Sequence, residues 1–173
     1  MMARLRDEAE ALAEALEFGL CDVRDAVAWA DAWILREDVP HERLCDVSLA
    51  SGRTPRAVMD LLHEFPGEPD RGAVDGLVLT ILADRMRREP APTAEVAWIL
   101  NRMAHEGRLP DGHLCEVAWC ARHELADADD LGITVEEVAA NLRSALDAAT
   151  ASTPARWSID LRPHRRGPSG ATS

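Results

Sequence analysis

Apolar residues recur every three to four positions along almost the whole chain, and this spacing predicts α-helices. Asp22, Thr54 and Thr134 are placed to cap helices that follow them. No sustained alternation with a period of two predicts a strand. The expected helices cover residues 3–18, 23–36, 40–50, 55–65, 71–88, a stretch capped by Thr93 that contains Trp98, a stretch capped by Asp111 that contains 114–123, and 134–149.

The helical pattern occurs twice, about 70 residues apart. Val27-Ala28-Trp29 recurs as Val96-Ala97-Trp98, and Leu44-Cys45-Asp46-Val47 recurs as Leu114-Cys115-Glu116-Val117. After a longer connection in the second copy, Thr54, Val58 and Leu62 recur 80 residues later as Thr134, Val138 and Leu142. Such repetition is typical of helical units that bury their apolar faces against one another. Repeated helical units usually build extended binding surfaces and not catalytic clefts.

We therefore predict an all-α protein made of two tandem four-helix units, arranged like HEAT repeats or a helical bundle. The pseudo-repeats, residues 1–66 and 70–150, form a single domain over residues 1–151. Residues 152–173 contain much Pro, Gly, Ser and Arg, which predicts a basic, flexible and disordered C-terminal tail.

Charge is unevenly distributed along the chain. The net charge is −12, with 15 Arg against 30 acidic residues before position 152 and four Arg against one Asp after it. An acidic body repels phosphate, which argues against nucleic-acid binding by the folded part and favours a basic protein partner. Because no apolar run approaches the ~20 residues of a membrane span, and the N-terminus lacks a signal peptide's apolar core, we expect a cytoplasmic protein that does not enter a membrane.

Residues with a counterpart in both copies are expected to form the framework. Trp29 and Trp98 lie on apolar helix faces and are predicted to be buried, and so is Trp119. The four cysteines have apolar neighbours, and a reducing compartment keeps thiols unpaired, so they are predicted to be free and buried. These cysteines are Cys21, Cys45, Cys115 and Cys120.

Residues present in one copy only are the candidates for partner binding. The second copy has a longer, acidic connection before its last helix, and insertions in repeats often fall on a binding face. Trp33 has Arg102 as its counterpart and is a candidate for exposure. Trp157, beside Arg156 in the tail, is typical of an interaction anchor, while docking of the tail on the body explains it equally well. The candidate partner-binding residues are Asp127, Asp129, Asp130, Trp33 and Trp157.

His113, Cys120 and His123 form the most metal-like cluster, because Cys and His are zinc ligands and these three lie near one helix face. Their spacing matches no known zinc motif, so a metal-dependent enzyme is less favoured than a binding role. The sequence has no nucleophile elbow and no Gly-rich phosphate loop. We expect no catalytic residue and no cofactor.

Residues 17–50 carry a family resemblance. The turn Glu17-Phe18-Gly19-Leu20, the helix AVAWADAWIL and the stretch opened by Pro40 are similar to small all-helical bacterial proteins of unassigned function, several of which resemble immunity partners of polymorphic or contact-dependent toxins. A similar but diverged stretch at 96–118 lacks a counterpart of Asp31. The resemblance implies a cytoplasmic protein that neutralises one toxin, and it carries over no functional residue. The matching residues are Phe18, Gly19, Leu20, Trp29, Ala30, Asp31, Ile34 and Pro40.

These features predict a stoichiometric protein-binding module, an immunity or antitoxin-like protein that occludes a basic toxin. In this hypothesis the acidic helix ends and the connection at 124–130 cover a basic active site, and complementary charge speeds association. The alternative is a helical scaffold or regulatory adaptor that engages its partner through the C-terminal tail.

Overall fold

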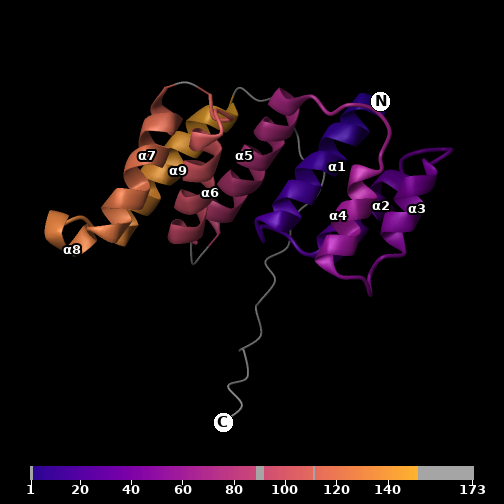
Figure 1. The fold of residues 1–173 in the computed structure, drawn as a ribbon, viewed down its shortest axis with the longest axis horizontal. Helices are drawn as coiled ribbons and strands as arrows, with labels where there is room; N and C mark the ends of the chain where they lie inside the picture. The colour runs from indigo at the N-terminus through magenta and orange to yellow at the C-terminus, as the bar shows by residue number, and fades with distance from the viewer. Residues whose placement is uncertain (1, 89–91, 111, 152–173) are drawn as a thin grey trace, which may run out of the picture.

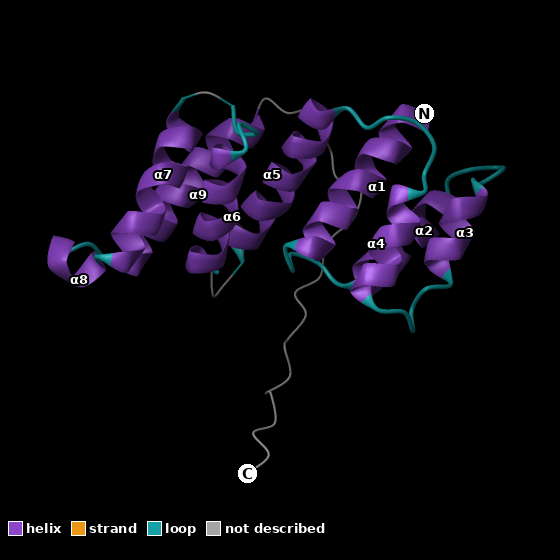
Figure 2. Cartoon of the chain, viewed as in Figure 1, coloured by secondary structure: helices purple, strands orange, loops and turns teal. Residues whose placement is uncertain are grey.

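The computed structural model describes residues 2–88, 92–110 and 112–151, apart from the side chains of Met2, Ala128 and Asp129. Throughout these residues the regular structure is helical, as predicted (Figure 2). None of the described helices is long and apolar enough to cross a membrane. The helices are α1 (Met2–Glu17), α2 (Val23–Ile34), α3 (Glu42–Ser48), α4 (Pro55–His63), α5 (Arg71–Arg87), α6 (Thr93–His105), α7 (His113–Ala126), α8 (Ala128–Leu131) and α9 (Val135–Ala151).

Side-chain caps open three helices where the sequence predicts them. Asp22 and Asp25 exchange hydrogen bonds in a capping box at the start of α2. Thr54 accepts a hydrogen bond from a backbone amide in the first turn of α4. Thr134 and Glu137 form a second capping box before α9. Local sequence therefore determines these boundaries, since each cap satisfies an amide that the helix leaves free.

Two predicted helix starts are wrong. Pro40 lies outside α3, because the acceptor that reaches a free amide of this helix is the imidazole Nδ1 of His41. Thr93 is the first residue of α6 and not its cap, and Pro92 holds the cap position without a side-chain hydrogen bond. The third predicted cap, Asp111, lies outside the described residues.

Equivalent helices pair in the same way in the two halves of the chain. In the first half α1 packs against α4 and α2 against α3, and in the second α5 packs against α9 and α6 against α7. The contact of α1 with α5 joins the halves into one elongated array, with α8 at its far end (Figure 1). This is the arrangement that two tandem four-helix units predict.

Each half has its own apolar core. The repeat-matched Leu62 and Leu142 are fully buried, one in the core of α1–α4 and the other in the core of the second half. α1 contributes to both, because Leu12 packs in the first core and Ala15 packs in the second. The first helix is therefore the structural link between the halves.

A stripe of four acidic residues on α1 faces the second half. Their spacing of three and four residues places them on one side of the helix. Glu14 pairs with Arg71 at 3.0 Å and with Arg108, and Glu17 pairs with Arg102 at 3.4 Å. Much of the acidic charge of α1 thus holds the two halves together. The stripe is Asp7, Glu10, Glu14 and Glu17.

Arg108 occupies the centre of this junction. Its side chain is only 12% exposed and lies between Glu14 on α1 and Asp75 on α5, with 2.6 Å between its Nη2 and the Asp75 Oδ1. Burial lowers the pKa of the guanidinium, but hydrogen bonds to Glu14 and Asp75 raise this pKa by a larger amount, so it lies above its ordinary value. Arg108 therefore stays charged and neutralises two enclosed carboxylates.

A buried carboxylate organises the first core. Glu8 is 1% exposed, and its Oε2 accepts hydrogen bonds from the indole nitrogens of Trp29 at 2.9 Å and Trp33 at 2.8 Å. Its Oε1 pairs with Arg4 at 2.9 Å. Buried indole N–H groups need an acceptor, so Glu8 explains why both rings are inside. The predicted burial of Trp29 is confirmed, and the expectation that Trp33 is exposed is wrong.

Candidate partner-binding surfaces

Trp98 and Trp119 are exposed, so the prediction that both are buried is wrong. Trp98 is 48% exposed and Trp119 is 40% exposed. The second core has no counterpart of Glu8, because the positions about 70 residues later are the apolar Leu77 and Val78. Without that carboxylate, the second half does not reproduce the site that buries a tryptophan in the first half.

The exposed rings form a continuous surface on α6 and α7. Trp98, Arg102 and His105 are separated by four and three residues, so they share one face of α6. The Arg102 guanidinium lies 6.0 Å from the Trp98 ring centroid, and the His105 and Trp119 ring centroids are 4.2 Å apart. We call these four residues the tryptophan surface.

Neighbouring side chains hold one end of the tryptophan surface in place. Phe18 packs edge-on against Trp98, with 6.5 Å between ring centroids. Arg102 lies 5.1 Å from the Phe18 centroid and pairs with Glu106 at 2.9 Å and with Glu17 at 3.4 Å. An aromatic group that is already ordered loses little entropy on binding, which favours its use as an anchor.

The acidic connection predicted as a loop is mostly helical. Residues 124–126 complete α7, residues 128–131 form α8, and Gly132, at φ +65°, follows. The Ala, Leu and Glu residues of this stretch have high helix propensity, which outweighs the preference of Asp for turns. The acidic stretch is therefore part of α7 and α8, at one end of the molecule, and is not a loop.

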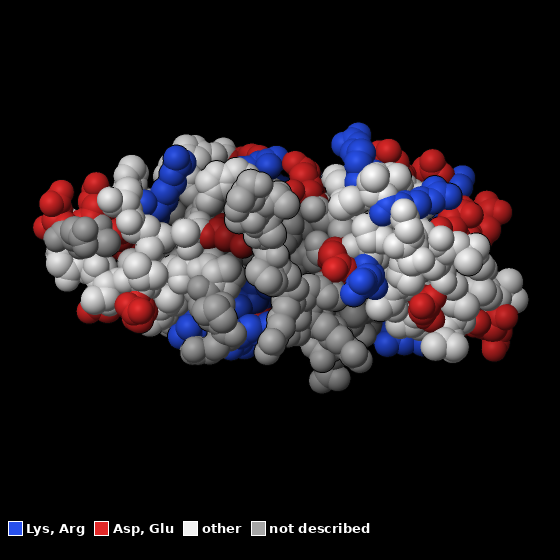
Figure 3. All heavy atoms as spheres, turned by 90° about the horizontal axis from the view of Figure 1, so that it is seen from below, with Lys and Arg blue, Asp and Glu red and all other residues white. Residues whose placement is uncertain are grey.

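Asp127 and Asp130 are exposed, and neither carboxylate forms a hydrogen bond or ion pair with another described residue. The side chain of Asp129 is not among those described. Figure 3 shows acidic side chains gathered at the α8 end of the molecule. Asp127 follows Trp119 by eight residues, or about 12 Å along a helix axis. The tryptophan surface and this acidic end are therefore close enough to contact one partner.

His113, Cys120 and His123 are all exposed on α7. Within the described part of the chain, no three His, Cys, Asp or Glu side chains are placed to hold a metal ion. His113 and Cys120 are seven residues apart, which is about 10 Å along the helix, whereas zinc ligands lie ~2 Å from the metal. These three candidate residues therefore do not form a zinc site by themselves.

The cysteines are free, as predicted, but Cys45 and Cys120 are exposed, so the prediction that all four are buried is wrong. They fall on the outer faces of α3 and α7, because the neighbouring residues Leu44 and Ala121 take the inward positions.

The four thiols are expected to react with iodoacetamide at different rates. Burial, with the nearby charges of Asp25 and Asp22, raises the pKa of the Cys21 thiol, and only the thiolate is nucleophilic. Cys21 should therefore be alkylated at least ~10-fold more slowly than Cys45 and Cys120. Peptide mass spectrometry after timed alkylation measures the rates, and urea-unfolded protein, in which the differences should vanish, is the control. Equal rates for Cys21 and Cys45 in the folded protein would contradict the assignment.

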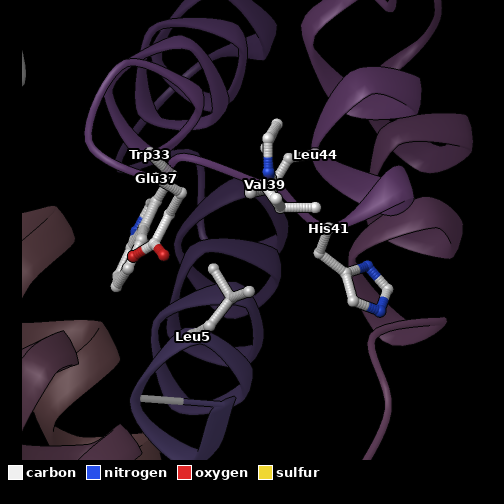
Figure 4. A pocket seen from close by; sticks show the side chains of 7 residues that line it. Leu5, Trp33, Glu37, Val39, His41 and Leu44 are labelled. Atoms are coloured by element: carbon white, nitrogen blue, oxygen red, sulfur yellow. The ribbon is translucent and has the colours of Figure 1, made fainter.

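A pocket of about 270 Å³ lies between the first turns of α1 and the connection from α2 to α3. Leu5 and Trp33 form its inner wall, and Figure 4 shows Trp33 and Glu37 on one side of it and His41 on the other. The indole N–H of Trp33 donates a hydrogen bond to Glu8, which holds the ring in place. Trp33 is therefore a pocket wall and not an exposed anchor. The full lining is Leu5, Trp33, Glu37, Val39, Pro40, His41 and Leu44.

The sequence did not predict this pocket. Its lining residue Val39 is 87% exposed. The available signal was a large apolar residue set among charges beyond the predicted end of the helix at Arg36, a position that leaves it no core to enter. Trp157, the other single-copy tryptophan, lies outside the described residues.

No protein-family model matches this chain, and neither the curated proteins nor the solved structures include a match to it.

Proposed function

We propose that the protein is a stoichiometric binding module that acts in the cytoplasm and occludes a basic protein, in the manner of an immunity or antitoxin protein. The observation that carries the proposal is the tryptophan surface beside unpaired carboxylates. Two large aromatic rings in a chain with five tryptophans stay at the surface, although burying them would favour folding. Exposed, ordered tryptophans are typical of the centre of a protein interface.

The charges of the surface indicate the chemistry of the partner. Arg102 is neutralised within the fold by Glu17 and Glu106, so it adds no free positive charge to the surface. Asp127 and Asp130 lie nearby without a partner among the described residues, and the chain carries a net charge of −12. A basic partner would reduce the repulsion among these negative charges. It would be attracted over a distance of about one Debye length. The aromatic faces of Trp98 and Trp119 also favour Arg and Lys side chains over acidic ones.

The proposal predicts that the affinity depends on the two exposed tryptophans. We expect Trp98→Ala and Trp119→Ala each to weaken binding about 10-fold or more, chiefly through faster dissociation. The measurement is surface plasmon resonance with the partner recovered from the native host by the intact protein. Leu49→Ala, at an 82% exposed apolar residue outside the surface, is the matched control and should change the affinity less than ~2-fold.

The acidic end should act on the association rate. We expect the double substitution Asp127→Arg and Asp130→Arg to slow association about 10-fold or more at low salt, and the difference should shrink as salt is added. As the control, Asp127→Arg and Asp130→Arg are each compared singly with Glu68→Arg, an exposed position between the two halves where the change in charge is the same. A partner whose binding is unchanged by both the tryptophan and the aspartate substitutions would refute the proposal, and so would an acidic partner.

A further inference from the structure

The pocket beside Trp33 has rigid apolar walls. Leu5 is 5% exposed and Leu44 is fully buried, so both side chains are anchored in the first core. Trp33 is 6% exposed and its indole nitrogen is tied to Glu8. His41 caps α3 through Nδ1, and its ring lies 5.8 Å from that of Phe65, measured between centroids. The pocket therefore has a preformed shape, which reduces the entropy cost of binding.

One charged group in the lining has no partner. Glu37 is half-buried, and its carboxylate makes no hydrogen bond or ion pair with any described residue. The adjacent Asp38 is exposed and is also without such a partner in the described residues. A carboxylate at an apolar pocket loses part of its hydration, and a cation is the group that would compensate it.

These properties select the ligand by size and chemistry. A volume of about 270 Å³ is at or below the small end of drug-sized sites, which suits a single side chain. An arginine combines an apolar stem, which fits walls such as Leu5 and Leu44, with a planar cation that binds carboxylates in bidentate fashion and stacks on aromatic rings. Glu37 and Trp33 supply both of those contacts on one side of the pocket (Figure 4).

We propose that the Trp33 pocket binds the side chain of an arginine presented by the partner protein, with the guanidinium at Glu37. The inference rests on the proposed function, because it names a group on the basic partner. It adds a second contact, because Leu5, in the pocket, and Phe18, beside Trp98, are 13 residues apart, or about 20 Å along α1. The partner would then contact both halves of the array.

The test uses the full-length protein and three capped pentapeptides, acetyl-Gly-Ser-Xaa-Ser-Gly-amide, in which Xaa is arginine, citrulline or norleucine. Citrulline has nearly the shape of arginine without its charge, and norleucine has only the apolar stem. Binding is followed by the NMR signal of the Trp33 indole N–H, which reports on the pocket wall. We expect saturable shifts with the arginine peptide and at least ~10-fold weaker binding of the other two.

The variant Glu37→Gln should abolish the preference for arginine over citrulline, while Asp38→Asn, a neighbour outside the lining, should preserve it within ~2-fold. Neither carboxylate has a partner in the described part of the chain, and an unchanged Trp29 indole signal shows that the core is intact. Equal binding of all three peptides would indicate an apolar occupant and overturn the proposal. A preference for arginine that survives in Glu37→Gln would also overturn it, as would Trp33 shifts that appear on concentrating the protein without peptide, because they indicate a second copy. None of these outcomes bears on Trp98 or Trp119, so this inference can fail while the proposed function stands.

Discussion

Replacing Glu8 by alanine is expected to lower the free energy of unfolding by about 3–5 kcal/mol. The Glu8 carboxylate is the acceptor for the buried indole N–H groups of both Trp29 and Trp33. Its loss leaves two buried donors unsatisfied, each costing about 1–3 kcal/mol, and opens a cavity in the first core. Urea unfolding followed by tryptophan fluorescence measures the change.

Two variants separate the hydrogen bonds from the charge of Glu8. Glu8→Gln retains an oxygen that can accept from both indoles, so it should cost roughly half as much as Glu8→Ala. Arg4→Ala removes the ion-pair partner of the enclosed carboxylate but leaves both indole hydrogen bonds in place, so it measures the charge pair by itself and should cost less than Glu8→Ala. If the free energy of unfolding of Glu8→Ala lies within ~1 kcal/mol of that of the natural protein, the carboxylate is not the organising group of this core.

The second large effect is expected at the junction between the halves. Arg108→Ala leaves the enclosed carboxylate of Asp75 without its cation and leaves Glu14 with Arg71 alone, at side-chain exposures of 14% and 11%. Breaking a buried pair by removing one partner costs about 3–5 kcal/mol, because the remaining charge is desolvated and uncompensated. Hydrogen exchange should show the loss first at the amides of α1 and α5, since these two helices share the cluster.

Arg102→Ala is the matched comparison for Arg108→Ala. Arg102 also links α1 to the second half through Glu17, but both of its pairs are 39% to 49% exposed. Exposed pairs contribute about 0–1 kcal/mol, so this substitution should change stability little. Equal destabilisation by the two substitutions would mean that burial does not set the strength of the junction.

The repeat predicted the architecture better than it predicted which residues are buried. Matched apolar residues such as Leu62 and Leu142 are buried in equivalent helices, as the duplication implies. The assumption that every shared residue is framework is wrong for Trp98 and Cys45, which are exposed. A duplicated residue keeps its place on a helix, but its burial depends on what the neighbouring helices have become since the copies diverged.

The prediction that residues present in one copy only lie at the surface is correct for some of them and wrong for one. Asp127 and Asp130 are exposed as expected, whereas Trp33 is a buried pocket wall. Glu37 and the apolar mouth of the pocket were not predicted, because nothing in a sequence shows which loop residues border a cavity. The pocket exists only where α1 meets the connection between α2 and α3.

Most helices could be located from the amino-acid sequence, because apolar period and capping residues such as Asp22 and Thr134 act within a few residues. The succession of two similar units could be read from it as well. Which tryptophans are buried could not, since their burial depends on a hydrogen-bond acceptor from another helix. Glu8 supplies it to Trp29 from 21 residues away, and Leu77 and Val78 cannot supply it to Trp98.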